Sequence, residues 1–269
     1  MINREGEFNI SSNKTHLVGI VNITDDSYYD GGRYNTVEKA LKRCEELEKL
    51  GVDIIELGAQ SFFPGRKEKT VEEQWQILKP VLKELTKHTK LLISIDTDEI
   101  ELMKLCADEG AKIMNILQPN EFHFETIKAL KNYPIGFVVM DYKNHNKPII
   151  QALQEREKEI WNWCLDHDIS TKRIIFDPGI GLPYGKNTEE TLEMFQRIDE
   201  LNEGPFPILL SYARKSFMQD LYSLNVEERL SPTVALSLYF YEKKVSFLRI
   251  HDVKDILIAL DIWKKVKGI

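Results

Sequence analysis

The sequence has 269 residues, of which 42% are hydrophobic and 29% charged, enough to bury one substantial core. Its formal net charge of −7 disfavours nonspecific binding to nucleic acid, so an anionic substrate would have to be held by a few locally placed cations. No apolar run approaches the length of a membrane span, and the polar first residues lack the pattern of a secretory signal. These totals predict a cytoplasmic globular protein with neither a nucleic-acid nor a membrane partner.

Short runs rich in Val, Ile and Leu alternate with longer amphipathic segments along the whole chain. The apolar runs, each predicted to be a strand buried on both faces, cover residues 17–23, 53–58, 91–96, 111–116, 135–140, 173–177, 208–211 and 246–250. The amphipathic segments, predicted to be helices, cover residues 36–51, 70–88, 99–110, 122–132, 149–166, 188–202 and 253–267.

Eight strands alternating with helices predict an α/β fold with a parallel sheet. Their number in a chain of this length favours a TIM (β/α)8 barrel over an open doubly wound sheet. The sequence contains no low-complexity linker or break in charge, so we expect residues 1–269 to form a single domain.

Local signals indicate where two of the helices begin and end. Thr36 and Gly51 flank the first helical segment as an N-cap and a left-handed C-cap. Thr70 and Glu73 have the spacing of a capping box at the start of the second. Pro80 lies inside the second segment and is expected to kink or divide it.

Motifs that would indicate other chemistry are incomplete in this sequence. The glycine-rich stretch 177–187 has the wrong spacing for a phosphate loop or a dinucleotide fingerprint, and Asn187 replaces the Ser or Thr of a phosphate loop. There is no paired Cys motif and no H-E-x-x-H, which argues against a zinc site. Cys44, Cys106 and Cys164 are far apart and odd in number, so we expect reduced, buried thiols.

Polar residues stand at the carboxyl end of every predicted strand, where barrels of this type build their active sites. They are Asn22, Thr24, Asp26, Gln60, Ser61, Asp96, Asn115, Asp141, Asp177, Arg214, Lys215, Arg249 and His251. Any one alone is better explained as a strand reaching water or a helix cap, as for Asp98, but the complete ring predicts one shared site. Its carboxylates and amide suit a flat, nitrogen-rich heterocycle, and its cations suit an anion or a carbonyl oxygen.

Blocks within this ring resemble, in order and position, the dihydropteroate synthase family. Residues 19–32 are similar to the family's opening signature, N-x-T-P-D-S-F-x-D-G-G. The later matching blocks are residues 94–97, 115–116, 177–181, 214–217 and 249–253. The resemblance covers nearly the whole chain and implies a pterin-binding TIM barrel that condenses 6-hydroxymethyl-7,8-dihydropterin diphosphate with p-aminobenzoate. It also implies Mg²⁺ as cofactor and a homodimer, with the last helices as the expected interface.

The resemblance further implies a role for individual residues. The pterin is expected to contact Asp96, Asn115, Met140, Asp177, Lys215 and Arg249. The diphosphate is expected to contact Asn22, Arg249 and His251, with Mg²⁺ bridging at Asn22. The arylamine is expected to contact Thr24, Tyr28, Ser61, Phe62, Phe63, Pro64 and Ser216. The expected catalytic residues are Asp96, Asp177 and Lys215, which would act on a pterin cation formed when the carbon–oxygen bond breaks first.

Departures from the family pattern gather in the loops expected to shape the arylamine pocket. Asp25 stands in place of a proline, and Tyr28 in place of a phenylalanine. Gln60 replaces an acid, Phe63 replaces an arginine, and Asp141 replaces a histidine. Because the G-I-V-N-I-T and R-L-S-P-T stretches are similar to the sulfonamide-insensitive branch of the family, we expect unusual treatment of arylamines, either as reduced sensitivity to sulfonamides or as acceptance of another aromatic nucleophile.

Two other functions remain open at this point. A pterin-binding methyltransferase would share the barrel and the acidic pterin site, but it would not share the blocks at 214–217 and 249–253. The second is a non-catalytic pterin-binding paralogue. It stays open because this chain has Phe63 in place of the family's arginine and Asp141 in place of its histidine. Such a protein would bind pterin without releasing diphosphate.

Overall fold

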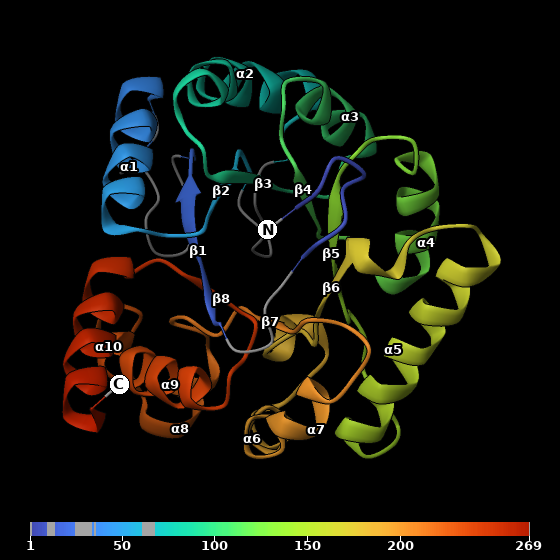
Figure 1. The fold of residues 1–269 in the computed structure, drawn as a ribbon. Helices are drawn as coiled ribbons and strands as arrows, with labels where there is room; N and C mark the ends of the chain where they lie inside the picture. The colour runs from blue at the N-terminus through green and yellow to red at the C-terminus, as the bar shows by residue number, and fades with distance from the viewer. Residues whose placement is uncertain (1, 10–13, 25–33, 35, 61–67, 269) are drawn as a thin grey trace.

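The computed structural model describes residues 2–9, 14–24, 34, 36–60 and 68–268. Its strands form one parallel sheet that curves around a central axis, with the helices outside it (Figure 1). The strand order is β6-β5-β4-β3-β2-β1-β8-β7, and Phe176 of β6 forms a parallel bridge with Ile208 beside β7. This bridge closes the sheet, so the predicted TIM barrel is confirmed.

The elements follow the predicted alternation closely. The strands are β1 (His16–Asn22), β2 (Ile54–Gly58), β3 (Leu92–Thr97), β4 (Ile113–Ile116), β5 (Gly136–Met140), β6 (Ile174–Asp177), β7 (Leu209–Leu210) and β8 (Phe247–Ile250). The α-helices are α1 (Val37–Leu50), α2 (Val71–His88), α3 (Ile100–Asp108), α4 (Asn120–Ala129), α5 (Ile149–Asp166), α6 (Thr188–Gln196), α7 (Ile198–Asn202), α8 (Phe217–Tyr222), α9 (Leu230–Glu242) and α10 (Val253–Lys267). Short 3₁₀ turns are η1 (Thr171–Arg173), η2 (Leu182–Tyr184) and η3 (Glu227–Arg229).

The predicted helix ends are largely confirmed. Thr36 caps α1, Gly51 ends it at φ 88°, and Thr70 and Glu73 form both bonds of a capping box on α2. Pro80 does not divide α2, which runs unbroken through it. The expectation that Asp98 caps α3 was wrong, because the N-cap position falls one residue later.

Two helical regions were predicted incorrectly. The single helix expected over 188–202 is two helices, because α6 ends at Gln196 and α7 begins at Ile198. The sequence predicts a long loop over 212–231 after the seventh strand, but this stretch contains α8 and η3, and α9 begins at its end, at Leu230. The sequence of α9, LSPTVALSLYFYE, is apolar on most of its surface and lacks the clear stripe of an amphipathic helix.

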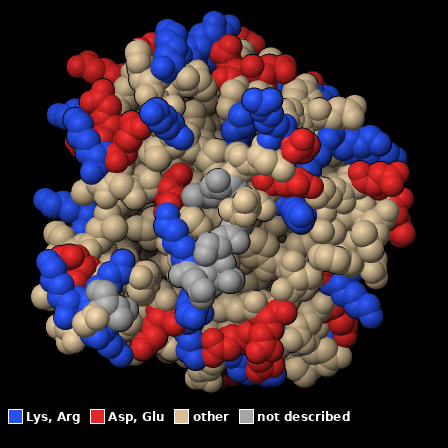
Figure 2. All heavy atoms as spheres, in the orientation of Figure 1, with Lys and Arg blue, Asp and Glu red and all other residues tan. Residues whose placement is uncertain are grey.

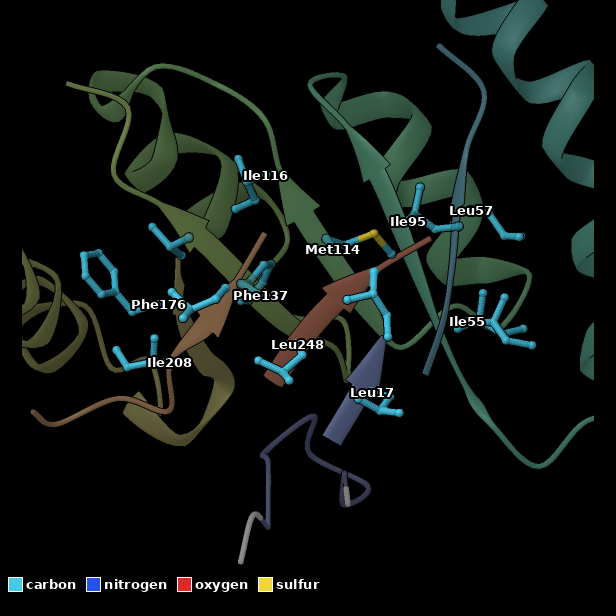
Figure 3. Close-up of a cluster of buried hydrophobic side chains, with 14 of the residues drawn as sticks. Leu17, Ile55, Leu57, Ile95, Met114, Ile116, Phe137, Phe176, Ile208 and Leu248 are labelled. Atoms are coloured by element: carbon cyan, nitrogen blue, oxygen red, sulfur yellow. The ribbon is translucent and has the colours of Figure 1, made fainter. Parts of the chain in front are cut away.

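The hydrophobic core has two layers, separated by the sheet. Side chains on the outer face of the strands pack against the helices, including Leu17, Leu57, Ile95 and Met114 (Figure 3). The interior of the barrel holds a smaller layer, which consists of Phe8, Val18, Ile54, Ile113, Val138, Ile175, Leu209 and Phe247. Because side chains alternate along a strand, the residues two positions beyond this inner layer also face the barrel axis.

Several surface and burial features complete the fold. Cys44, Cys106 and Cys164 are buried free thiols, as predicted. On the face seen in Figure 2, acidic and basic side chains are interspersed around the rim. Within the described ranges, none of the helices is both long enough and apolar enough to cross a bilayer.

Candidate active site

The candidate site lies directly above the inner apolar layer, at the carboxyl end of the strands. Stepping two residues along a strand leads from Ile54 to Glu56 in β2 and from Ile113 to Asn115 in β4. The same step leads to the remaining members of this polar layer, which are Met140, Asp177, Ser211 and Arg249. The alternation of the barrel interior therefore places three of the predicted ring residues, Asn115, Asp177 and Arg249, on one floor.

Arg249 links two buried carboxylates in the centre of this floor. Its Nε donates to Glu56 Oε1 at 2.5 Å, and its Nη2 donates to Asp96 Oδ2 at 2.7 Å. Its Nη1 donates to the Ser211 hydroxyl at 3.1 Å. Because a guanidinium presents its donors in a rigid fork, this arrangement fixes both carboxylates relative to β8.

Asn115 contacts the second oxygen of each of the two carboxylates, Asp96 and Glu56. Its Nδ2 donates to Asp96 Oδ1 at 2.8 Å and lies 3.3 Å from Glu56 Oε2. The Ser94 hydroxyl also donates to Glu56, at 3.1 Å. Glu56 was missed in the sequence, where we treated 53–58 as a uniformly apolar strand. The signal that could have found it is its place as a charged residue between Ile55 and Leu57 inside a predicted buried strand.

Burial affects the charge of Asp96 and Asp177. Burial raises the pKa of Asp96 to about 7, assisted by the nearby Glu56 and opposed by Arg249 and Lys215. Burial likewise raises the pKa of Asp177 to about 6, although a hydrogen bond from the Gly179 amide at 2.8 Å and the nearby cations hold it down. Both acids therefore titrate near neutrality, as groups in functional sites often do.

Lys215 reaches this floor from the connection after β7. Its Nζ lies 4.3 Å from the centre of the Tyr184 ring, a cation–π contact. Lys215 also lowers the pKa of both Asp96 and Asp177, which indicates that its charge acts on both carboxylates. Tyr184 was not singled out in the sequence, where the glycine-rich stretch 177–187 was compared only with a phosphate loop and a dinucleotide fingerprint.

Arg214 was placed in the predicted ring, but it is held in an ion pair with Asp252 on the rim. Its Nε and Nη2 donate to the two Asp252 oxygens at 2.8 and 2.9 Å, and Nη1 donates to the Val226 and Glu227 carbonyls. Its backbone has a φ of 55°, in the left-handed region. These contacts brace the connection that carries Lys215.

Asp141 follows β5 and is enclosed rather than facing the site. Its carboxylate accepts hydrogen bonds from Lys186 at 2.6 Å, Asn120 at 2.9 Å and His145 at 2.7 Å. The polar sequence around His145, KNHNK, predicts a solvated loop residue, and this prediction is wrong, because the His145 side chain is 9% exposed and bonded to Asp141. The pairing joins positions up to 45 residues apart, which no local pattern in the sequence indicates.

Comparisons with known proteins decide the family. A family model described as pterin binding enzyme matches residues 18–251. The chain is 33% identical over 254 residues to a dihydropteroate synthase of Clostridium beijerinckii, with 92% of each chain covered. The chain belongs to the dihydropteroate synthase family. It is also 32% identical over 259 residues to the dihydropteroate synthase type-3 of Escherichia coli, covering 92% of this chain and 98% of that one.

Solved dihydropteroate synthases share the barrel along almost the whole chain. The Xanthomonas albilineans enzyme with 4-aminobenzoic acid is 28% identical, with a TM-score of 0.83 over 96% of this chain and 95% of that one. The Clostridium difficile enzyme in the presence of pteroic acid is 27% identical, with a TM-score of 0.84 over 96% and 98% of the two chains. The Yersinia pestis enzyme, at 22% identity and a TM-score of 0.85, supports the fold alone.

Of the remaining positions expected from the dihydropteroate synthase pattern, those that the structure describes follow β1, β7 and β8 at the same end of the barrel. Asn22 ends β1, and a Cβ added at Gly58 would lie 3.3 Å from the Asn22 amide oxygen, so the two strands are close there. Thr24 is buried just beyond, and His251 is half-buried after β8. Ser216 directly precedes α8. The expected arylamine contacts Tyr28, Ser61, Phe62, Phe63 and Pro64 lie outside the described residues.

Proposed function

We propose that this chain condenses 6-hydroxymethyl-7,8-dihydropterin diphosphate with p-aminobenzoate and releases diphosphate. The observation that carries the proposal is the pair of buried, inward-facing acids, Asp96 and Asp177, set between the cations Lys215 and Arg249. The proposal is further supported by two solved relatives from Xanthomonas albilineans, one with 4-aminobenzoic acid and one in complex with 7,8-dihydropteroate.

In this proposal the pterin ring lies on the polar floor. Asp177 accepts from the ring N–H groups, while Asp96 and Asn115 bind the opposite edge of the ring. Met140 is 4% exposed at the end of β5 and supplies an apolar wall. The Lys215 ammonium, which lies over Tyr184, donates to a ring carbonyl or nitrogen. A flat heterocycle thereby satisfies donors and acceptors that would otherwise face a water-filled mouth.

The proposed reaction begins when the bond between the pterin methylene carbon and the diphosphate oxygen breaks. The electron pair leaves with the oxygen, and the resulting cation is delocalised into the ring above Asp96 and Asp177. Fixed carboxylates in a buried site stabilise such a cation without reorganisation. The arylamine nitrogen then attacks the methylene carbon and loses a proton. Exclusion of water from the site protects the cation from hydrolysis.

The departing diphosphate is proposed to meet Arg249, His251 and Asn22 at the rim of the mouth. Arg249 already directs Nε to Glu56 and Nη2 to Asp96, so it would contact the diphosphate through the Nη1 edge that now faces Ser211. Arg249 therefore neutralises the floor and the leaving group together.

Mg²⁺ is the proposed cofactor, held at Asn22 together with the diphosphate. In the part of the chain that the structure describes, no group of three or more His, Cys, Asp or Glu side chains could hold a metal ion. Mg²⁺ commonly keeps several waters and takes one or two protein oxygens beside substrate phosphates, so the amide oxygen of Asn22 fits a sparse site of this kind. When bound, the ion would supply positive charge that stabilises the leaving diphosphate.

A second part of the proposal concerns the assembly. Ile258, Ile262 and Val266 recur at four-residue intervals on α10 and are 59%, 58% and 80% exposed. An exposed apolar stripe of this kind is typical of an interface between subunits, and we propose that it contributes to a homodimer. Light scattering after size exclusion should give the mass of two chains, and Ile262→Glu should shift it toward one.

Reduced sensitivity to sulfonamides is a further proposal, supported by the sequence departures in the arylamine loops. A sulfonamide and p-aminobenzoate compete for one subsite, so altered loops can weaken one more than the other. Inhibition by sulfamethoxazole as strong as that of ordinary family members would contradict it.

The experiment that tests the function measures diphosphate release from the pterin diphosphate with Mg²⁺, with and without p-aminobenzoate. We expect release that depends on p-aminobenzoate and falls by two or more orders of magnitude in Asp177→Asn. Release without incorporation of p-aminobenzoate would indicate a different nucleophile. Tight pterin binding without any release would instead indicate a non-catalytic pterin-binding protein or a methyltransferase.

A further inference from the structure

A fully buried ion pair lies behind the floor of the site, between Asp141 after β5 and Lys186 before α6. Both side chains have 0% exposure. Lys186 Nζ donates to Asp141 Oδ2 at 2.6 Å and to the Asp141 carbonyl at 2.7 Å. It also donates to the Tyr184 carbonyl at 3.1 Å. The ammonium is thus enclosed by oxygen acceptors.

Stability alone is a poor explanation for this pair. Two charges lose their hydration when they are buried, and replacing such a pair by apolar side chains of similar volume is often neutral or stabilising. Burial opposes the ionised form of Asp141, yet Lys186, His145 and Asn120 hold its pKa below the usual range. The charges are therefore retained at a cost, which fits a role in fixing geometry.

The pair connects directly to Asp177 through two contacts. The Asp141 amide donates to the Asp177 carbonyl at 2.7 Å, which extends the β5–β6 pairing by one position. Gly179, whose amide holds the Asp177 carboxylate, is pressed against the pair: a Cβ on Gly179 would lie 2.4 Å from the Asp141 carbonyl and 3.3 Å from Lys186 Nζ. The turn that orients Asp177 is thus packed on Asp141 and Lys186.

A second connection leads to Lys215. Lys186 holds the backbone of Tyr184, and the ring of Tyr184 lies 4.3 Å from Lys215 Nζ. Tyr142, next to Asp141, packs edge-on against the same ring with centroids 5.3 Å apart. Any displacement of the ion pair would therefore shift the surface on which the Lys215 ammonium rests.

We infer that Asp141 and Lys186 are a positioning pair, which clamps the connection between β6 and α6 so that Asp177 and Lys215 keep their geometry toward the pterin. Neither residue touches the substrate in this inference, which rests on the proposed function of the same site. Misplacement of a reacting group by about 1 Å can cost on the order of a hundredfold in rate.

The decisive variant removes both charges at once, as Asp141→Leu with Lys186→Met. It leaves no unpaired buried charge, but Asn120 and His145 lose their acceptor, so we expect folding with a melting temperature within several degrees of the wild type. We expect kcat to fall by ten- to a hundredfold, with a much smaller change in KM for the arylamine. We also expect the acidic limb of the pH–kcat profile, where Asp177 titrates, to move. Lys243→Met is a control that breaks an ion pair with Asp199 on the outside of the barrel and should change none of these.

A milder variant covers the case in which the double variant does not fold. Asn120→Ser removes a donor to the Asp141 carboxylate and an acceptor for the Tyr142 amide but leaves both charges in place. We expect a three- to tenfold loss of kcat with the same shift of the profile. Wild-type kcat and pH profile in a folded double variant, or in Asn120→Ser, would overturn the inference.

The affinity for 6-hydroxymethylpterin, measured by calorimetry, distinguishes failure of this inference from failure of the proposed function. If the wild-type protein releases no diphosphate, the proposed function fails, but pterin affinity still reports on Asp177. A loss of affinity of tenfold or more in the double variant would then support the positioning pair, and unchanged affinity would overturn it.

Discussion

Arg214 and Asp252 face each other in a two-pronged ion pair that joins the connection after β7 to the start of α10. The two N–O distances are 2.8 and 2.9 Å, and both side chains are almost completely buried. Lys215 follows Arg214 in the chain, and His251 precedes Asp252. The pair therefore fixes Lys215 and His251, which we propose contact the pterin and the diphosphate, relative to each other.

We expect Arg214→Lys to lower kcat about tenfold or more, because lysine keeps the charge but cannot make two parallel hydrogen bonds. The melting temperature should also fall by several degrees, since the Val226 and Glu227 carbonyls lose their donor. Steady-state diphosphate release and thermal unfolding provide the measurements. Arg197→Lys is the matched control, because Arg197 makes a similar fork to Glu200 on the surface. Equal effects at both positions would contradict the prediction.

Glu56 should influence the titration of Asp96. Burial raises the pKa of Asp96 to about 7, and repulsion from Glu56 adds to this increase. Glu56→Gln removes the repulsion and leaves Asp96 as the remaining carboxylate partner of Arg249, so the Asp96 pKa should decrease. Asp96 would then stay ionised at lower pH, and the limb of the kcat/KM profile that lies near pH 7 should move toward acid. A limb that stays in place, or moves toward alkali, would show that Glu56 does not act in this way.

Glu157 on α5 should make stability depend on pH. Its carboxylate oxygens are buried without a hydrogen-bond partner in the described structure, and burial raises its pKa to about 8. The folded state therefore binds a proton more tightly than the unfolded state, so this group lowers the free energy of unfolding as pH rises from about 4.5 to 8. Glu157→Gln should remove that loss and become more stable than the wild type by ~2 kcal/mol at pH 8.5.

Chemical denaturation at pH 5 and pH 8.5 measures the Glu157 effect. The difference between variant and wild type should be larger at pH 8.5. Glu203→Gln, which neutralises an exposed carboxylate near the same helix, should show no such pH dependence. A Glu157→Gln advantage that is the same at both values would argue against a buried proton.

Gly136 in β5 should tolerate no side chain while Phe8 is in place. A Cβ there would lie 2.3 Å from Phe8 Cζ, and Phe8 belongs to the inner layer of the barrel. Gly136→Ala should therefore cost about 1–3 kcal/mol of stability through overpacking. Adding Phe8→Ala relieves the clash, so urea unfolding of the double variant should show less destabilisation than the sum of the two single variants.

The sequence was sufficient to predict the barrel and most of the ring, because strand periodicity and the position of polar residues at strand ends are local signals. Which ring members face substrate could not be predicted in this way. Arg214 and Asp141 both follow predicted strands, as the site residues do. Arg214 is instead held in an ion pair with a residue 38 positions away, and Asp141 in one with a residue 45 positions away. Glu56 is the reverse case, because it lies in the site but was not predicted there. A charged residue inside an apolar run has no local sequence partner that indicates its role.

The three buried thiols can report on local opening of this barrel. Cys44, Cys106 and Cys164 lie on α1, α3 and α5, and burial raises the pKa of Cys44 to about 12 and that of Cys164 to about 11. A protonated, enclosed thiol is inert to alkylation until its helix lifts away from the sheet. Mass spectrometry of pulse-labelled protein would therefore time the opening of three separate βα units in one native sample, with no introduced probe.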